Sequence, residues 1–95
     1  MMFTPRPITR DDLKIMNEMQ PNIAKGLVNF YWRGDITLED LEFTLSPLQI
    51  IHLNDKVRTW LYRLREWGAL PLHGQQSVMR GAIWTARQEI ERGKL

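Results

Sequence analysis

Residues 54–70 read NDKVRTWLYRLREWGAL, and this stretch decides the fold. Its apolar side chains recur every three or four positions, at Val57, Trp60, Leu61, Leu64 and Trp67. A period near 3.6 residues predicts an amphipathic helix that buries one face. Gly68 and Pro71 come next, and both residue types are typical of a helix end. We therefore expect a helix that ends at Trp67 and packs this apolar arc against a core.

The start of this helix has two interpretations. Ser46 and Pro47 form a typical helix start, with serine as the cap and proline at the first helical position, and the apolar spacing continues from there. One interpretation is therefore a single helix over residues 47–67. The other places a break at Asn54, which is also a good cap residue, and leaves a shorter helix over residues 55–67.

Cap signals upstream predict further helices. Thr9 is a good N-cap and is followed by two aspartates whose carboxylates complement the helix dipole, so a first helix is expected up to about Gln20. Pro21 suits the first turn of a second helix, which Gly34 would end. Residues 37–40, TLED, form a near capping box that predicts a short helix to about Thr44.

The last quarter of the chain also has two interpretations. From Ser77 to about Arg92 the apolar residues cluster on one helical face, which favours a single amphipathic helix at the cost of one interior glycine, Gly81. Alternatively, residues 70–73 and 82–85 pair as a β-hairpin, and a short last helix follows.

Together these signals predict a mainly α fold, a compact single-domain bundle of four to five helices over residues 1–95, in which one short β-hairpin is the alternative to helix. An apolar fraction of 43% with 25% charged residues is typical of a globular domain. The chain has no cysteine, which excludes disulfides and thiolate metal sites. Prolines and arginines interrupt the N-terminal sequence MMFTPRPITRDD, so we expect no signal peptide, no membrane span and a cytoplasmic location.

Side chains that could carry catalysis are few. Neither of the two serines stands in a nucleophile-elbow motif. The two histidines, His52 and His73, lack the close spacing to other ligands that zinc sites use, and no phosphate-binding or dinucleotide-binding motif occurs. Asp11 and Asp12 diverge on a helix and fit capping better than acid–base chemistry. We therefore expect no enzyme, no metal and no cofactor.

Charge is distributed unevenly along the chain. The net charge is +2, but residues 35–55 carry five acidic and no basic side chains. Residues 56–95 carry eight basic against three acidic side chains, a local net charge of +5. This asymmetry indicates a nucleic acid or an acidic protein surface as partner, and a solvated charged face is the alternative interpretation.

One longer pattern joins a helix that opens T-x-x-x-L to a later helix of pattern V-x-x-x-L-x-x-L-x-x-x-G-[AL]-L. The matching residues are Thr37, Leu41, Val57, Leu61, Leu64, Gly68 and Leu70. This pattern resembles the helix-turn-helix region of winged-helix DNA-binding domains. The resemblance implies that the apolar positions pack on the core, that the glycine ends the recognition helix, and that its exposed face enters the major groove. It also implies that the tail hairpin would be the wing.

Under this resemblance the DNA-binding residues are those outside the apolar arc, Lys56, Arg58, Thr59, Tyr62 and Arg63. Arginines contact guanine edges or phosphates, and the hydroxyls of threonine and tyrosine reach backbone oxygens. The first functional prediction is therefore a small transcriptional regulator that binds duplex DNA. The alternative is that these side chains form only the solvated face of a core helix.

The four tryptophans support a second functional prediction. Most are expected in the core, but Trp84 projects away from the apolar face of the predicted tail helix. An exposed tryptophan is a candidate anchor for a protein interface, either with a host protein or with a second copy of the chain as a homodimer. The alternative function is thus a small protein of the kind that phages and mobile elements encode, which binds and inhibits a host protein complex.

Overall fold

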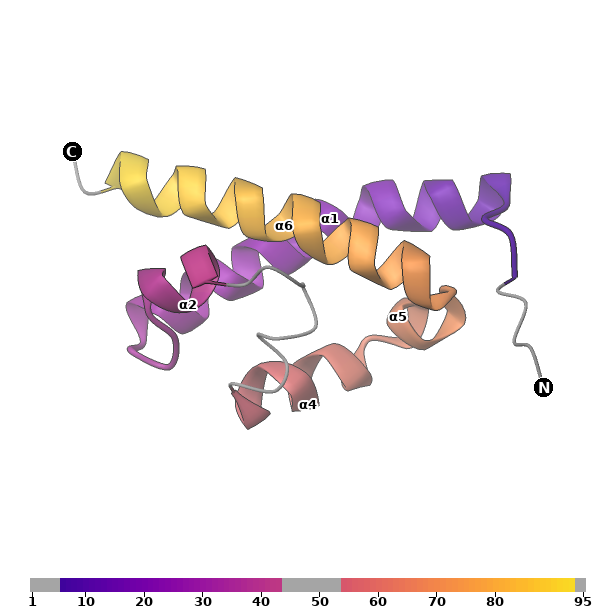
Figure 1. The fold of residues 1–95 in the computed structure, drawn as a ribbon. Helices are drawn as coiled ribbons and strands as arrows, with labels where there is room; N and C mark the ends of the chain where they lie inside the picture. Colours follow the sequence, from indigo (N-terminus) through magenta and orange to yellow (C-terminus); the bar gives the residue numbers. More distant parts are fainter. Residues whose placement is uncertain (1–5, 44–53, 94–95) are drawn as a thin grey trace.

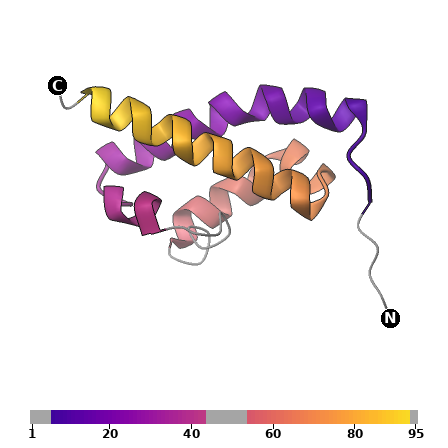
Figure 2. The same ribbon diagram turned by 45° about the horizontal axis from the view of Figure 1, so that its top comes forward.

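The computed structural model describes residues 6–43 and 54–93. These residues form helices α1 (Arg10–Trp32), α2 (Leu38–Phe43), α4 (Asp55–Arg63), α5 (Arg65–Ala69) and α6 (Leu72–Gly93). The described part of the chain contains no strand, which confirms the mainly helical class. The two long helices, α1 and α6, run side by side in the same direction, and α2, α4 and α5 lie together on one side of this pair (Figures 1 and 2).

The two ends of α1 lie where the sequence predicts a helix start, at Thr9, and a helix end, at Gly34. The Thr9 hydroxyl accepts from the Asp12 amide at 3.1 Å, and the Thr9 amide donates to the Asp12 carboxylate at 2.9 Å, which makes a capping box. At the other end Gly34 adopts a positive φ of 83°. Its amide donates to the Tyr31 carbonyl and the Asp35 amide to the Phe30 carbonyl, both at 2.9 Å, in the Schellman arrangement that glycine allows.

The predicted break at Pro21 is wrong, because α1 continues through this residue without interruption. An interior proline removes one helix hydrogen bond and costs roughly 3 kcal/mol. Pro21 is exposed, so its ring faces solvent, while Met19 and Ile23 on either side are buried on one common face. Burial of side chains of this size stabilises by roughly 1.5–3 kcal/mol each, which offsets the cost and keeps both halves in one helix.

Two more predicted caps are confirmed. Thr37 and Asp40 exchange hydrogen bonds at 2.9 and 3.1 Å at the start of α2. The Asn54 side chain accepts from the amides of Lys56 at 2.9 Å and Val57 at 3.2 Å at the start of α4. Because the backbone of Asn54 is extended, the single helix over residues 47–67 is wrong and the break at Asn54 is correct. The predicted start at Ser46 lies outside the described residues.

Neither interpretation anticipated a second break, at Leu64. Its backbone is extended, with φ −77° and ψ 113°, so α4 ends at Arg63 and α5 begins at Arg65. The change of direction brings Trp67 into the core, where it is 2% exposed, and leaves Leu64 half-buried beside it. The Gln75 side chain then donates to the Trp67 carbonyl at 2.7 Å and fixes the end of α5.

Helix α6 begins at Leu72, five residues before the predicted start, and continues to Gly93. The hairpin alternative is therefore wrong, and the described residues contain no wing. The interior glycine lies against α1, and a Cβ atom at Gly81 would require the end of the Gln20 side chain to move. Helices α1 and α6 pack closely against each other over this stretch.

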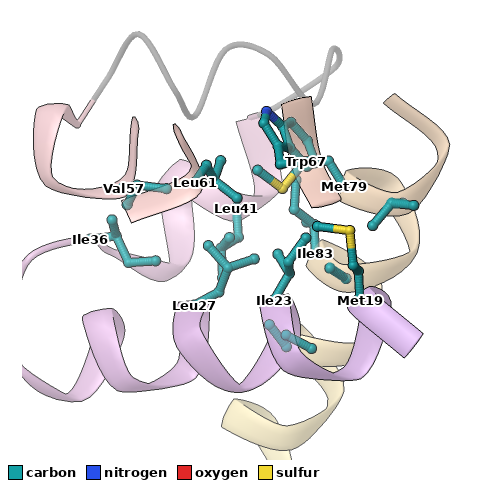
Figure 3. Packing of buried hydrophobic residues seen from close by; sticks show 14 of the residues in the cluster. Met19, Ile23, Leu27, Ile36, Leu41, Val57, Leu61, Trp67, Met79 and Ile83 are labelled. Atoms are coloured by element: carbon teal, nitrogen blue, oxygen red, sulfur yellow. The ribbon is translucent and has the colours of Figure 1, made fainter. Parts of the chain in front are cut away.

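All five described helices contribute to the core (Figure 3). The labelled side chains are Met19, Ile23, Leu27, Ile36, Leu41, Val57, Leu61, Trp67, Met79 and Ile83. The apolar arc of the sequence prediction is confirmed at Val57 and Leu61, which are 0% and 1% exposed. Among the described helices, none has the length and apolar character needed to cross a bilayer.

Candidate functional site

The structure brings the five predicted DNA-binding residues together on α4. Lys56, Arg58, Thr59, Tyr62 and Arg63 are all exposed, whereas Val57 and Leu61 hold the opposite face of the helix in the core. Tyr62 is 69% exposed, which leaves most of its ring and its hydroxyl in solvent. We call these five residues the α4 face.

Two cations of the α4 face are held by carboxylates that the sequence analysis did not assign. Lys56 Nζ lies 2.9 Å from an oxygen of Asp35, in the turn after α1, and Arg58 lies 2.9 Å from Asp55. The second pair has the helical i,i+3 spacing, which is a signal visible in the sequence. The first joins residues 21 positions apart, so only the packing of α4 beside the end of α1 reveals it.

A groove of about 390 Å³ runs along one edge of the α4 face. Its lining joins three residues of the α4 face to an aromatic pair and an aspartate, namely Lys56, Thr59, Arg63, Phe30, Trp60 and Asp55. The rings of Phe30 and Trp60 meet edge to face, with centroids 5.6 Å apart. Trp60 was predicted as part of the buried apolar arc, but it is half-buried at this surface.

A second, smaller cavity of about 130 Å³ lies between α1 and the break that separates α4 from α5. It is lined by Ile15, Glu18, Met19, Asn22, Ile23, Leu64 and Glu66. These residues were not predicted from the sequence as a group. The break at Leu64 creates this juxtaposition, and the amphipathic period gave no sign of it.

Trp84 is 62% exposed on the face of α6 that points away from the core, as the sequence predicted. The expectation that most tryptophans are core is wrong, because Trp32 is also 57% exposed and Trp60 is only half-buried, so Trp67 alone is fully buried among the four. Trp32 packs edge to face on Tyr31, with centroids 4.9 Å apart, and lies near Gly93 at the end of α6.

The buried carboxylate of Asp12 makes hydrogen bonds that hold parts of the fold together. The two terminal nitrogens of Arg6 donate to its two oxygens at 2.7 and 3.2 Å, and Arg6 also donates to the carbonyl of Ala69 at 3.0 Å. The hydrogen bond from Arg6, followed by that from the Thr9 amide, lowers the pKa of Asp12 to about 2. A carboxylate held ionised in this way links the N-terminal segment, α1 and α5, and is a poor general acid.

Over residues 6–43 and 54–93, no three histidine, aspartate or glutamate side chains gather in a group that could hold a metal ion. His73 lies in the first turn of α6, and His52 lies outside the described residues. Compared with known proteins, the chain matches no family model, no curated protein and no solved structure.

Proposed function

We propose that this protein binds duplex DNA through the α4 face and acts as a small transcriptional regulator of helix-turn-helix type. One observation supports the proposal above the others. Arg58, Tyr62 and Arg63 project together from one exposed side of a helix whose other side is fixed in the core. A rigid helix that presents arginines and hydroxyls is the element that enters a major groove.

The ion pairs on the α4 face are compatible with phosphate binding. Arg58 and Asp55 are 46% and 82% exposed, so this pair is solvated and worth only about 0–1 kcal/mol, whereas Asp35, the partner of Lys56, is only 18% exposed. Phosphates of a duplex can therefore replace Asp55 as the partner of Arg58. Arg63 has no ion-pair partner among the described residues and is available for contact without any exchange.

The break at Leu64 also favours the proposal. On a continuous helix Glu66 would extend the α4 face by one turn and repel phosphate. In the structure Glu66 belongs to α5 and lines the cavity against α1, so Asp55 is the acidic residue that remains beside the arginines. Since residues 72–85 belong to α6 and do not form a hairpin, the contact we propose is made by α4 without a wing.

Fluorescence anisotropy with a labelled duplex of mixed sequence tests the proposal. We expect binding at about 50 mM salt that weakens steeply towards about 200 mM, because each phosphate contact adds about 0.9 to the slope of log affinity against log salt. Arg63→Ala should lower that slope by about one contact, whereas Arg92→Ala, an exposed arginine on the last turn of α6, should not. Enrichment of one sequence from a randomised duplex pool would support a regulator, and absence of binding at the lower salt concentration would contradict DNA binding.

A second candidate function is docking on a host protein, and the exposure of Trp84 favours it. Large aromatic side chains in solvent are typical anchors of protein interfaces, and Arg80, one turn before Trp84, is exposed as well. An affinity pull-down from nuclease-treated cell extract separates the two functions. A protein captured by the wild type but not by Trp84→Ala would favour docking, and loss of all partners after nuclease treatment would favour DNA.

A further inference from the structure

We infer that the cavity between α1 and the α4–α5 break is a binding site for an alkylammonium group, the side chain of a lysine on a partner protein. This inference goes beyond DNA binding and does not depend on it, because no residue of the α4 face lines the cavity.

The size of the cavity fits one extended side chain. Its volume is about 130 Å³. An apolar cavity of roughly 150 Å³ is known to accept a six-atom ring, and a lysine side chain beyond its β-carbon has four heavy atoms. The site is thus large enough for a single side chain and too small for a folded element.

The lining is apolar at depth and acidic at the surface. Met19 and Ile23 are buried, and Ile15 and Leu64 are half-buried, which makes a hydrocarbon floor. The polar lining residues are all exposed, and they are Glu18, Asn22 and Glu66. A lysine places its hydrocarbon stem on apolar surface and its ammonium group at the water boundary, so its polarity runs in the same order as that of the cavity.

The charge of the cavity lining favours a cationic side chain as ligand over an anionic or a neutral one. Glu18 comes from α1 and Glu66 from α5, and within the described residues neither carboxylate has an ion-pair partner. An ammonium group donates three hydrogen bonds and accepts none; the two carboxylates supply only acceptors, and the Asn22 amide offers one acceptor oxygen beside its NH2 donors. A carboxylate ligand would instead be repelled by both glutamates.

The test is a titration of the full chain by methyl NMR. Resonances of Ile15, Ile23, Met19 and Leu64 are followed with Nα-acetyl-lysine methylamide and with its norleucine analogue, which has the same stem without the charge. We expect saturable shifts of these methyl groups with the lysine compound, at about 1 mM or weaker, and at least fivefold weaker binding of norleucine. Equal binding of the two compounds, or no saturable shift with lysine, would overturn the proposal.

Matched variants test whether the two glutamates contribute to binding of the ammonium group. Glu18→Gln and Glu66→Gln should each weaken lysine binding about 1.4- to 5-fold, the range expected for a solvated ion pair. Glu89→Gln removes an exposed glutamate of α6 outside the cavity and should leave binding unchanged. A third probe, n-butylammonium, distinguishes the source of the cation: if it binds while the lysine compound does not, the site accepts a free amine and the protein partner is excluded.

Discussion

The indole of Trp60 lies directly over Gly26 of α1, so close that a Cβ atom at Gly26 would overlap the six-membered ring. This contact fixes where α4 crosses α1. The groove beside the α4 face includes Phe30, one turn after Gly26, and the smaller cavity includes Asn22, one turn before it. The position of Trp60 on Gly26 thus separates the two candidate sites along one seam between helices.

Gly26→Ala should therefore destabilise the protein. Alanine in a helix interior is normally preferred to glycine by roughly 0.5–1 kcal/mol, but overpacking against a fixed aromatic ring costs roughly 1–3 kcal/mol. We expect a net loss of about 1–2 kcal/mol in the free energy of unfolding measured with urea. Gly68→Ala is the control, because a Cβ atom at Gly68 meets open space, and it should be neutral or stabilising. Equal effects of the two substitutions would contradict the packing of Trp60.

Leu61 and Leu64 should respond differently to truncation, although both belong to the predicted apolar arc. Leu61 is 1% exposed, so Leu61→Ala should cost roughly 2–5 kcal/mol. Leu64 is half-buried at the helix break, and Leu64→Ala should cost roughly 1–2 kcal/mol. Urea unfolding of both variants measures the difference. A larger loss at Leu64 would mean that α4 and α5 form one helix with Leu64 in its buried face.

The caps could be predicted from the sequence because their chemistry is local. Thr9 with Asp12 and Thr37 with Asp40 satisfy backbone amides within four residues, so no knowledge of the fold is needed. The helix through Pro21 and the break at Leu64 could not be predicted in the same way. Both depend on which side chains the rest of the fold buries, and tertiary burial outweighs local propensity.

In the candidate site too, some features could be predicted from local sequence and others depend on contacts between distant helices. Helical projection alone placed Arg58, Tyr62 and Arg63 on an exposed face, because exposure follows from the period of the buried residues. The pairing of Lys56 with Asp35 and the cavity lined by Glu66 require contacts between helices that are distant in sequence. Their sequence signal is weak since charge pairs across elements have no fixed spacing.

Acid should weaken the fold through Asp12. Its pKa is about 2 when folded and 3.8 ordinarily, so the ionised carboxylate stabilises the fold fully above about pH 4. That contribution is lost as the pH falls from about 4 to about 2. Asp12→Asn should flatten this part of the curve of unfolding free energy against pH, and so should Arg6→Ala, which removes the main cause of the shift. Asp11→Asn, which removes an exposed carboxylate that Arg6 does not bind, is the control. An unchanged curve for Asp12→Asn would show that the link between Arg6 and Asp12 is absent in solution.

Asp55→Asn should strengthen DNA binding if the α4 face contacts phosphate. The substitution releases Arg58 from its pair at 2.9 Å and removes the negative charge that this arginine contacts. A solvated carboxylate is worth about 0.2–1 kcal/mol to such a neighbour, so we expect an affinity about 1.4- to 5-fold higher at about 50 mM salt, measured by fluorescence anisotropy. Asp11→Asn, which neutralises an exposed aspartate in the first turn of α1, controls for the change in net charge.

The loss of Asp55 from the first turn of α4 also costs about 0.3–1 kcal/mol of helix stability, so thermal melts must show that the variant is folded at the temperature of the titration. Weaker binding by folded Asp55→Asn, or an equal gain from Asp11→Asn, would place the DNA contact away from the α4 face.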